Sequence, residues 1–136
     1  LPHEQQQVRE LAYLHKIGQL VSLPAGQNNL NETWQDQQHV LLGGRILEMV
    51  PHLRPLAPAI RHFAEHWDGS GFPDGLAGPQ IPLYARIIGL ANAYESQLQA
   101  GHSIAEAVES LHKTGYYDPS LCTLLKDMVE ADEVKI

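Results

Sequence analysis

The chain has few of the features that would tie it to nucleic acid, to a membrane or to a disulfide framework. Its 136 residues contain 9 Lys and Arg against 16 Asp and Glu, which gives a net charge of −7, and no block of like charge is present. Binding to nucleic acid or to anionic membranes normally rests on basic patches. Cys122 is the single cysteine, which excludes an intrachain disulfide. No apolar run approaches the roughly 18 residues that a transmembrane helix needs. We therefore expect a cytoplasmic protein that binds neither nucleic acid nor a membrane.

The start of the chain, Leu1-Pro2-His3-Glu4, has neither an initiator methionine nor a signal-peptide pattern. We therefore expect residues 1–136 to be a piece of a longer protein, folded as one domain. A chain of this size can bury roughly two-thirds of its unfolded surface around a single core. The sequence leaves open whether further helices precede this piece in the parent protein.

The sequence also lacks any stretch of strand length that alternates between apolar and polar residues, whereas apolar residues recur at helical spacing. Ser103 and Glu106 form a capping box, and Gly101 and Gly115 stand where helices are expected to stop. These patterns predict an all-α domain of about six helices, at residues 4–20, 31–50, 53–66, 82–100, 103–114 and 118–129, followed by an acidic tail at 130–133. In the helix at 82–100, the aligned apolar residues are Leu83, Ile87, Leu90, Ala91, Tyr94 and Leu98.

Two of the eight histidines, His15 and His39, interrupt apolar helical stripes. An inward imidazole needs a hydrogen-bond partner or a metal ion, because leaving it unpaired costs a few kcal/mol. A hydrogen-bonded core histidine is the commoner explanation for one such residue, but two on adjacent helices are also typical of a metal site. The sequence leaves both explanations open. The histidines expected to be ordinary solvated side chains are His3, His52, His66, His102 and His112.

Residues 66–76, His-Trp-Asp-Gly-Ser-Gly-Phe-Pro-Asp-Gly-Leu, are predicted to form a shaped loop between two helices. The glycines allow positive φ and close backbone approach, and Pro73 fixes its own φ. Trp67 and Phe72 can anchor the loop, so we expect it to be ordered. Ser70 lacks the Gly-x-Ser-x-Gly spacing of a nucleophile elbow and is interpreted as a loop residue.

This loop resembles the signature of the HD-GYP family, roughly His-His-Glu-x-x-Asp-Gly-x-Gly-Tyr-Pro. The resemblance extends from about residue 11 to residue 130. Residues 14–19 are similar to the family's Leu-His-Asp-Ile-Gly-Lys, residues 81–88 to its Ile-Pro-Leu-x-Ala-Arg-Ile, and residues 115–119 to its Gly-x-x-Phe-Asp-Pro. It implies an HD-domain-like helical bundle. Active members of the family hold two or three iron or manganese ions, which activate a hydroxide to cleave cyclic di-GMP.

Most of the metal ligands that this resemblance implies are replaced in this sequence. Two histidines are kept, the family's first aspartate is a lysine, its adjacent histidine pair is Phe-Ala, and its late aspartate is an asparagine. The residues of this vestigial metal site are His15, Lys16, His39, Phe63, Ala64 and Asn92. The resemblance therefore implies a degenerate member without the di- or trinuclear metal centre and with no cofactor.

The signature loop is kept apart from the exchange of tyrosine for phenylalanine, and its residues are Asp68, Gly69, Gly71, Phe72 and Pro73. We therefore expect a catalytically inactive signalling module. It would act as an output or regulatory domain through protein contacts of the Gly71-Phe72-Pro73 segment, with a partner in cyclic di-GMP signalling.

Two alternatives remain open at this point. The first is a phosphodiesterase for cyclic di-GMP with a reduced site that holds one weakly bound Fe, Mn or Zn, with ligands from His15, His39, His62, His66 and Asp68. The second is a sensor that binds a cyclic dinucleotide without cleaving it, with Lys16 and Arg86 as the phosphate contacts. For Arg86, a salt bridge or a structural clamp on the loop is at least as well supported as a phosphate contact.

Overall fold

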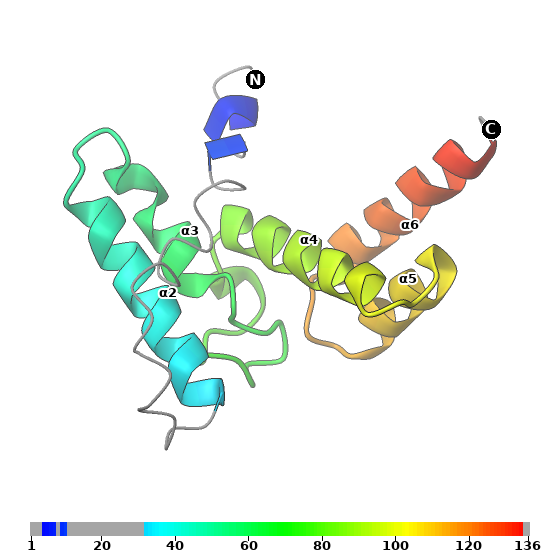
Figure 1. Ribbon diagram of the computed structural model, residues 1–136, viewed down its shortest axis with the longest axis horizontal. Coiled ribbons are helices and arrows are strands. Elements are labelled where there is room, and N and C mark those ends of the chain that lie inside the picture. The colour runs from blue at the N-terminus through cyan, green and yellow to red at the C-terminus, as the bar shows by residue number, and fades with distance from the viewer. Residues whose placement is uncertain (1–3, 8, 11–31, 135–136) are drawn as a thin grey trace.

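A computed structural model of the chain describes residues 4–7, 9–10 and 32–134 (Figure 1). These residues form helices, turns and loops and contain no β-strand, so the predicted all-α fold is confirmed. Residues 4–7 and 9–10 are helical, as expected for the start of the first predicted helix. His15 and Lys16 lie outside the described residues.

Each described α-helix packs against the α-helix that follows it in the chain. The described elements are α2 (Glu32–Glu48), the 3₁₀ turn η3 (Arg54–Leu56), α3 (Ala57–His62), the 3₁₀ turn η4 (Gly78–Gln80), α4 (Leu83–Gln99), α5 (Ile104–Lys113) and α6 (Pro119–Val134). Helix α2 packs on α3, and α3 packs on α4. Helix α4 then runs across the molecule to α5 and α6 (Figure 1). None of the described helices is both long and apolar enough to span a bilayer.

Two hydrophobic clusters form the core, and α4 contributes to both. The first lies between α2, α3 and α4 and consists of Leu47, Leu56, Ala57, Ala59, Ile60 and Ile88. The second joins α4 to α5 and α6 through Leu90, Leu111 and Cys122. The expectation that Cys122 is a small buried hydrophobe is confirmed. Burial also raises the pKa of its thiol.

The predicted start of α5 is confirmed: Ser103 and Glu106 exchange hydrogen bonds there in a capping box. Helix α3 ends at His62 and not at residue 66. The chain turns there, where the Glu65 N–H donates to the His62 carbonyl, because the next residues must meet the signature loop. Helix α6 continues to Val134 through the predicted acidic tail, since Glu is a good helix former and Glu130 stays exposed.

The predicted apolar face of α4 is correct at Leu90, which is buried, and wrong towards the two ends of the helix. Leu83 and Leu98 are exposed, whereas the buried residues of this helix are Ala85, Ile88, Gly89 and Leu90. The buried face uses small residues where α3 approaches closely. A pattern weighted toward large side chains misses such a face.

The residue that follows α3, Phe63, comes very close to α4 at Gly89. A Cβ atom added there would lie 2.5 Å from the carbonyl oxygen of Phe63, a backbone atom that cannot rotate away. At Gly44, about one turn before the end of α2, the nearest atom to an added Cβ would be the Cβ of Arg61 at 3.4 Å, an ordinary contact. Gly44 and Gly89 are thus both buried and helical, and they differ in the space around them.

We expect Gly89→Ala to lower the free energy of unfolding by about 1–3 kcal/mol, because overpacking outweighs the gain in helix propensity. Gly44→Ala is the matched control. It should be neutral or should stabilise the protein by up to about 1 kcal/mol. Urea unfolding followed by circular dichroism measures both. Equal effects of the two substitutions would contradict the close packing of α4 on the end of α3.

Candidate functional site

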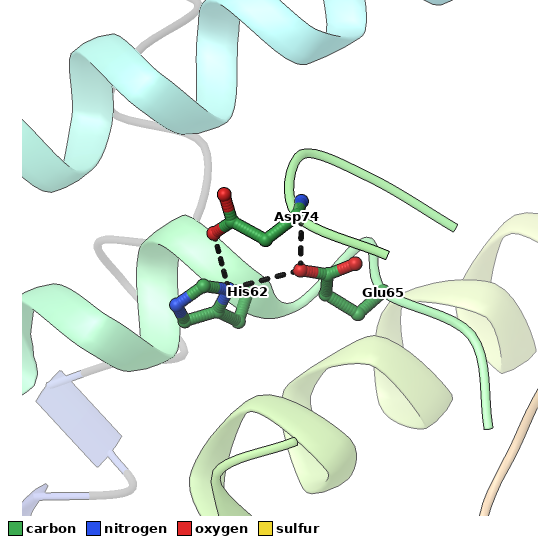
Figure 2. Close-up of side chains that lie close together, drawn as sticks. All are labelled: His62, Glu65 and Asp74. Carbon is green, nitrogen blue, oxygen red and sulfur yellow. Dashed lines mark hydrogen bonds and ion pairs between the residues drawn. The ribbon is translucent and has the colours of Figure 1, made fainter. Parts of the chain in front are cut away.

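The signature loop is organised around the carboxylate of Glu65, whose side chain is fully buried. Its Oε1 accepts hydrogen bonds from the N–H groups of Gly75 at 2.9 Å and Leu76 at 3.2 Å. Its Oε2 accepts one from the N–H of Asp74 at 3.1 Å (Figure 2). A buried carboxylate is tolerated only when such donors replace the lost water. The far end of the loop is thus fixed to the turn that follows α3.

The ion pair between Arg61 and Asp74 extends this network to the surface. The Nε and Nη2 atoms of Arg61 donate to the two carboxylate oxygens of Asp74 at 3.0 and 3.1 Å. These hydrogen bonds lower the pKa of the Asp74 carboxyl below its ordinary value. His62, the last residue of α3, places its Nδ1 3.1 Å from Glu65 Oε2 and 3.5 Å from Asp74 Oδ2 (Figure 2). One imidazole nitrogen therefore faces two carboxylates.

The middle of the loop packs backbone against backbone at Gly71. A Cβ added to Gly71 would lie 2.5 Å from the carbonyl oxygen of Ala64 and directly against the backbone nitrogen of His66. Only glycine fits this contact, which confirms the expected close approach. Gly69 has a φ of 86°, the positive value predicted for a glycine of this loop. The Phe72–Pro73 peptide bond is cis.

The near end of the loop lies against residues 115–118. The ring of His66 stacks on Tyr116 with a centroid distance of 3.9 Å and an interplanar angle of 11°. The N–H of Trp67 donates to the Tyr116 carbonyl at 2.7 Å. Asp68 Oδ1 accepts from both the N–H and the hydroxyl of Ser70, an Asx turn, and the Ser70 oxygen lies 2.9 Å from His66 Nδ1. His66 is thus half-buried and not freely solvated, and burial lowers its pKa.

Arg86 holds the loop, α4 and the start of α6 together. Its Nη1 donates to Asp118 Oδ2 at 2.8 Å, and its Nε donates to the Ile81 carbonyl at 3.0 Å. Its guanidinium lies over the Trp67 ring at 5.8 Å from the centroid. Asp118 Oδ1 also accepts the N–H of Ser120 in the first turn of α6. The contacts match the structural clamp among the two roles considered for Arg86, and its role as a phosphate contact stays a prediction.

The described residues of the predicted vestigial metal site lie on α2, directly after α3 and on α4. His39 is half-buried on α2, and its buried Nδ1 has no hydrogen-bond partner in the part of the chain that the structure describes. Phe63 packs against the first hydrophobic cluster. Asn92 lies half-buried on α4. His15 and Lys16 fall outside the described residues.

The described residues at these positions do not fit a two-metal centre. Phe63 and Ala64 offer no ligand atom, and Asn92 offers a neutral amide where a carboxylate would bridge two ions. His39 Nδ1 is a ligand atom without a protein partner among the described residues. No reaction step through a metal pair can therefore be drawn from these side chains.

Among the described residues, one group of three metal-ligating side chains lies within 4.8 Å, and it consists of His62, Glu65 and Asp74. His39, His66 and Asp68, which were proposed to join His62 around one residual ion, are not part of this group. With His15 undescribed, that ligand set stays a prediction. The sequence analysis missed the roles of Glu65 and Asp118. A carboxylate directly before a Gly- and Pro-rich loop, and an Asp-Pro at a helix start, are the patterns that could have identified them.

A groove with a volume of about 480 Å³ lies elsewhere, between α5 and α6. It is lined by Ala105, Val108, Glu109, His112, Lys113, Lys126, Val129 and Glu130. None of the predicted site residues lines it.

Comparisons with known proteins point to one family. A family model described as an HD domain matches residues 1–121. A probable cyclic di-GMP phosphodiesterase of Vibrio cholerae is 31% identical over 128 residues, which cover 79% of this chain and 29% of the relative. A cyclic di-GMP phosphodiesterase of Thermotoga maritima is 30% identical over 99 residues, 68% of this chain and 27% of the relative.

A solved structure shares the fold. The crystal structure of a cyclic GMP-AMP specific phosphodiesterase of V. cholerae superposes with a TM-score of 0.65 at 23% identity, over 91% of this chain and 32% of that one. At this identity the likeness supports the helical fold alone. The chain spans less than a third of the length of each of these three proteins.

We expect Glu65→Gln to release the far end of the loop. An amide in place of the carboxylate turns an NH₂ group toward backbone N–H donors, and each buried donor left unpaired costs about 1–3 kcal/mol. Hydrogen exchange should show loss of protection at the amides of residues 74–76, while amides in α5 stay protected. Unchanged protection at residues 74–76 would show that another group holds the loop.

The pKa of His66 offers a second check on this geometry. We expect it to lie below the ordinary value of 6.5, because burial disfavours the charged ring. Tyr116→Ala should expose the ring and move the pKa back up, whereas Asp68→Asn, which removes a favourable negative charge, should move it further down. NMR titration of the imidazole protons measures both shifts. Shifts in the same direction would contradict burial as the main cause.

Proposed function

This chain belongs to the HD domain family, which confirms the resemblance carried by the signature loop, and from that premise we propose that it is a degenerate HD-GYP module without turnover. In this proposal it is a cytoplasmic output or regulatory domain of a longer signalling protein. The observation that carries this proposal is that apolar side chains, Phe63 and Ala64, stand where the family has its adjacent histidine pair. Phe63 packs on the first hydrophobic cluster, and Ala64 provides no ligand atom.

The chemistry explains why this substitution matters. A metal pair stabilises both the attacking and the leaving oxygen of the phosphodiester, and it needs imidazoles and bridging carboxylates. With Phe63, Ala64 and Asn92 at three ligand positions, the described residues supply too few donors. Neighbouring Glu65 does not replace the lost pair, because its carboxylate is turned toward the far end of the loop, where it accepts the N–H groups of residues 74–76.

The retained loop supports a role in protein contacts. Its shape depends on Glu65, on Gly71 and on the Arg86–Asp118 pair, none of which requires a metal ion. In this proposal the Gly71-Phe72-Pro73 segment is presented to a partner in cyclic di-GMP signalling. Phe72 and Pro73 are both half-buried, so each ring keeps an accessible surface for such a contact.

The comparisons favour a second candidate more directly than this first one. The relatives described above are named as phosphodiesterases of cyclic dinucleotides, which supports a function that involves such a ligand. His39 Nδ1, which has no hydrogen-bond partner among the described residues, is consistent with one ion in a reduced hydrolytic site with Fe, Mn or Zn. A sensor that binds without cleavage is the other form of this candidate, with Lys16 as its phosphate contact. Arg86 would join it only by giving up part of its contact with Asp118.

Turnover assays separate these candidates. We expect purified protein with added Mn²⁺ or Fe²⁺ to leave cyclic di-GMP and 3'3'-cGAMP uncleaved. The combined variant Lys16→Asp, Phe63→His, Ala64→His and Asn92→Asp should bind metal and gain hydrolysis, because it restores the family's ligand types. Hydrolysis by the unaltered chain that His39→Ala abolishes would establish the reduced-site enzyme. Binding without cleavage that Lys16→Ala weakens would establish the sensor.

A further inference from the structure

Three ligand atoms converge at the end of α3, apart from the family's ligand positions. His62 Nδ1, a carboxylate oxygen of Glu65 and one of Asp74 lie within 4.8 Å of one another. They come from the last residue of α3, from the turn after it and from the far end of the signature loop. Figure 2 shows the imidazole of His62 below Asp74 and beside Glu65, with one ring nitrogen directed at both carboxylates.

The distances match those between ligands around a small divalent ion. His62 Nδ1 lies 3.1 Å from Glu65 Oε2 and 3.5 Å from Asp74 Oδ2. Bonds of about 2.1 Å to a tetrahedral zinc ion place neighbouring ligand atoms about 3.4 Å apart. A single imidazole N–H can donate one strong hydrogen bond, but here two acceptors face it. An ion in place of that shared proton would satisfy all three groups, and we propose that His62, Glu65 and Asp74 bind one divalent transition-metal ion.

The charges around Glu65 point the same way. Its carboxylate is fully buried, and among the described residues it forms no direct ion pair with an arginine or a lysine. Arg61 pairs with Asp74 instead, at the exposed edge of the cluster. The buried charge is therefore faced by neutral N–H groups and by His62 alone. A cation beside a buried carboxylate offsets the cost of removing that charge from water.

The ligands are already held in place by other groups. Backbone N–H groups fix Glu65, and the planar fork of Arg61 orients Asp74, which are the kinds of outer contacts that support metal ligands. The Asp74 side chain is 38% exposed, so an ion and a water ligand can reach the site from solvent. One imidazole with two carboxylates suits Zn²⁺, Mn²⁺ or Fe²⁺ better than Mg²⁺ or Ca²⁺. The positive charge of Arg61 lowers the affinity.

Such an ion would cross-link α3 to the signature loop and hold the Gly71-Phe72-Pro73 segment in one position. It would use Glu65 and Asp74, which do not stand at any metal-ligand position of the family pattern. The site does not depend on whether the chain hydrolyses a cyclic dinucleotide.

The test titrates ZnCl₂ into the metal-free full chain, followed by calorimetry and thermal unfolding. We expect one Zn²⁺ per chain, a rise in Tm, and an X-ray absorption spectrum with a single imidazole among oxygen donors. Asp74→Asn and His62→Asn should each weaken binding more than about tenfold and remove the rise in Tm. Asp74 is exposed, so its variant should keep the fold, which circular dichroism checks.

Asp68→Asn and His66→Gln are the matched controls, because they change the same residue types in or beside the same loop. Both should bind Zn²⁺ as the unaltered chain does. The proposal is overturned if no Zn²⁺ binds, or if binding persists in Asp74→Asn and His62→Asn. Two imidazoles in the spectrum, with loss of binding in His39→Ala, would also overturn it in favour of a family-type site. The turnover assays test the proposed function separately. Their outcome does not depend on whether Zn²⁺ binds to His62, Glu65 and Asp74.

Discussion

A buried carboxylate that must be compensated is the constraint on which the site depends. Glu65 lies where the chain leaves α3, and the backbone N–H groups of residues 74–76 come to it from the other end of the loop. Charge-assisted hydrogen bonds of this kind are about twice as strong as neutral ones. Here the accepting side chain, that of Glu65, is fully buried. The loop therefore closes on itself through one side chain. Gly71 packs against the backbone of residues 64–66, where nothing larger than hydrogen has room.

This closed loop lies at the junction of the two hydrophobic clusters. Helix α4 begins beside it and contributes Ile88 to one cluster and Leu90 to the other. The ion pair between Arg86 and Asp118 ties the same region to the start of α6. Its two side chains are largely buried, so breaking the pair by removing one partner would leave an uncompensated charge. The loop, α4 and α6 are consequently held as one unit, even though their clusters are separate.

Local patterns in the sequence predicted the helices well, and contacts between distant residues escaped them. The capping box at Ser103 and the stop at Gly101 are encoded within a few residues, and both are found. The buried face of α4 was misjudged because its contacts with α3 depend on the absence of a side chain at Gly89. The role of Glu65 depends on residues about ten positions away, whose approach is set by the loop's own conformation. Periodicity carries no information on such pairings. The ligand positions were read from the family pattern, and His15 and Lys16 lie outside the described residues.

The way Gly71 and Glu65 build the loop bears on how members of this family are sorted by sequence. The Glu-x-x-Asp-Gly-x-Gly pattern records the packing of a backbone around a carboxylate: Glu65 accepts the N–H groups, Asp68 forms the Asx turn and Gly71 allows the contact. The hydrogen bonds and the packing in these three roles form without a catalytic metal pair or a substrate. Selection for a well-shaped loop would therefore preserve the motif in a lineage whether or not its metal ligands persist. Searches keyed to this motif select chains that fold alike, and catalytic competence has to be judged from the separate ligand positions.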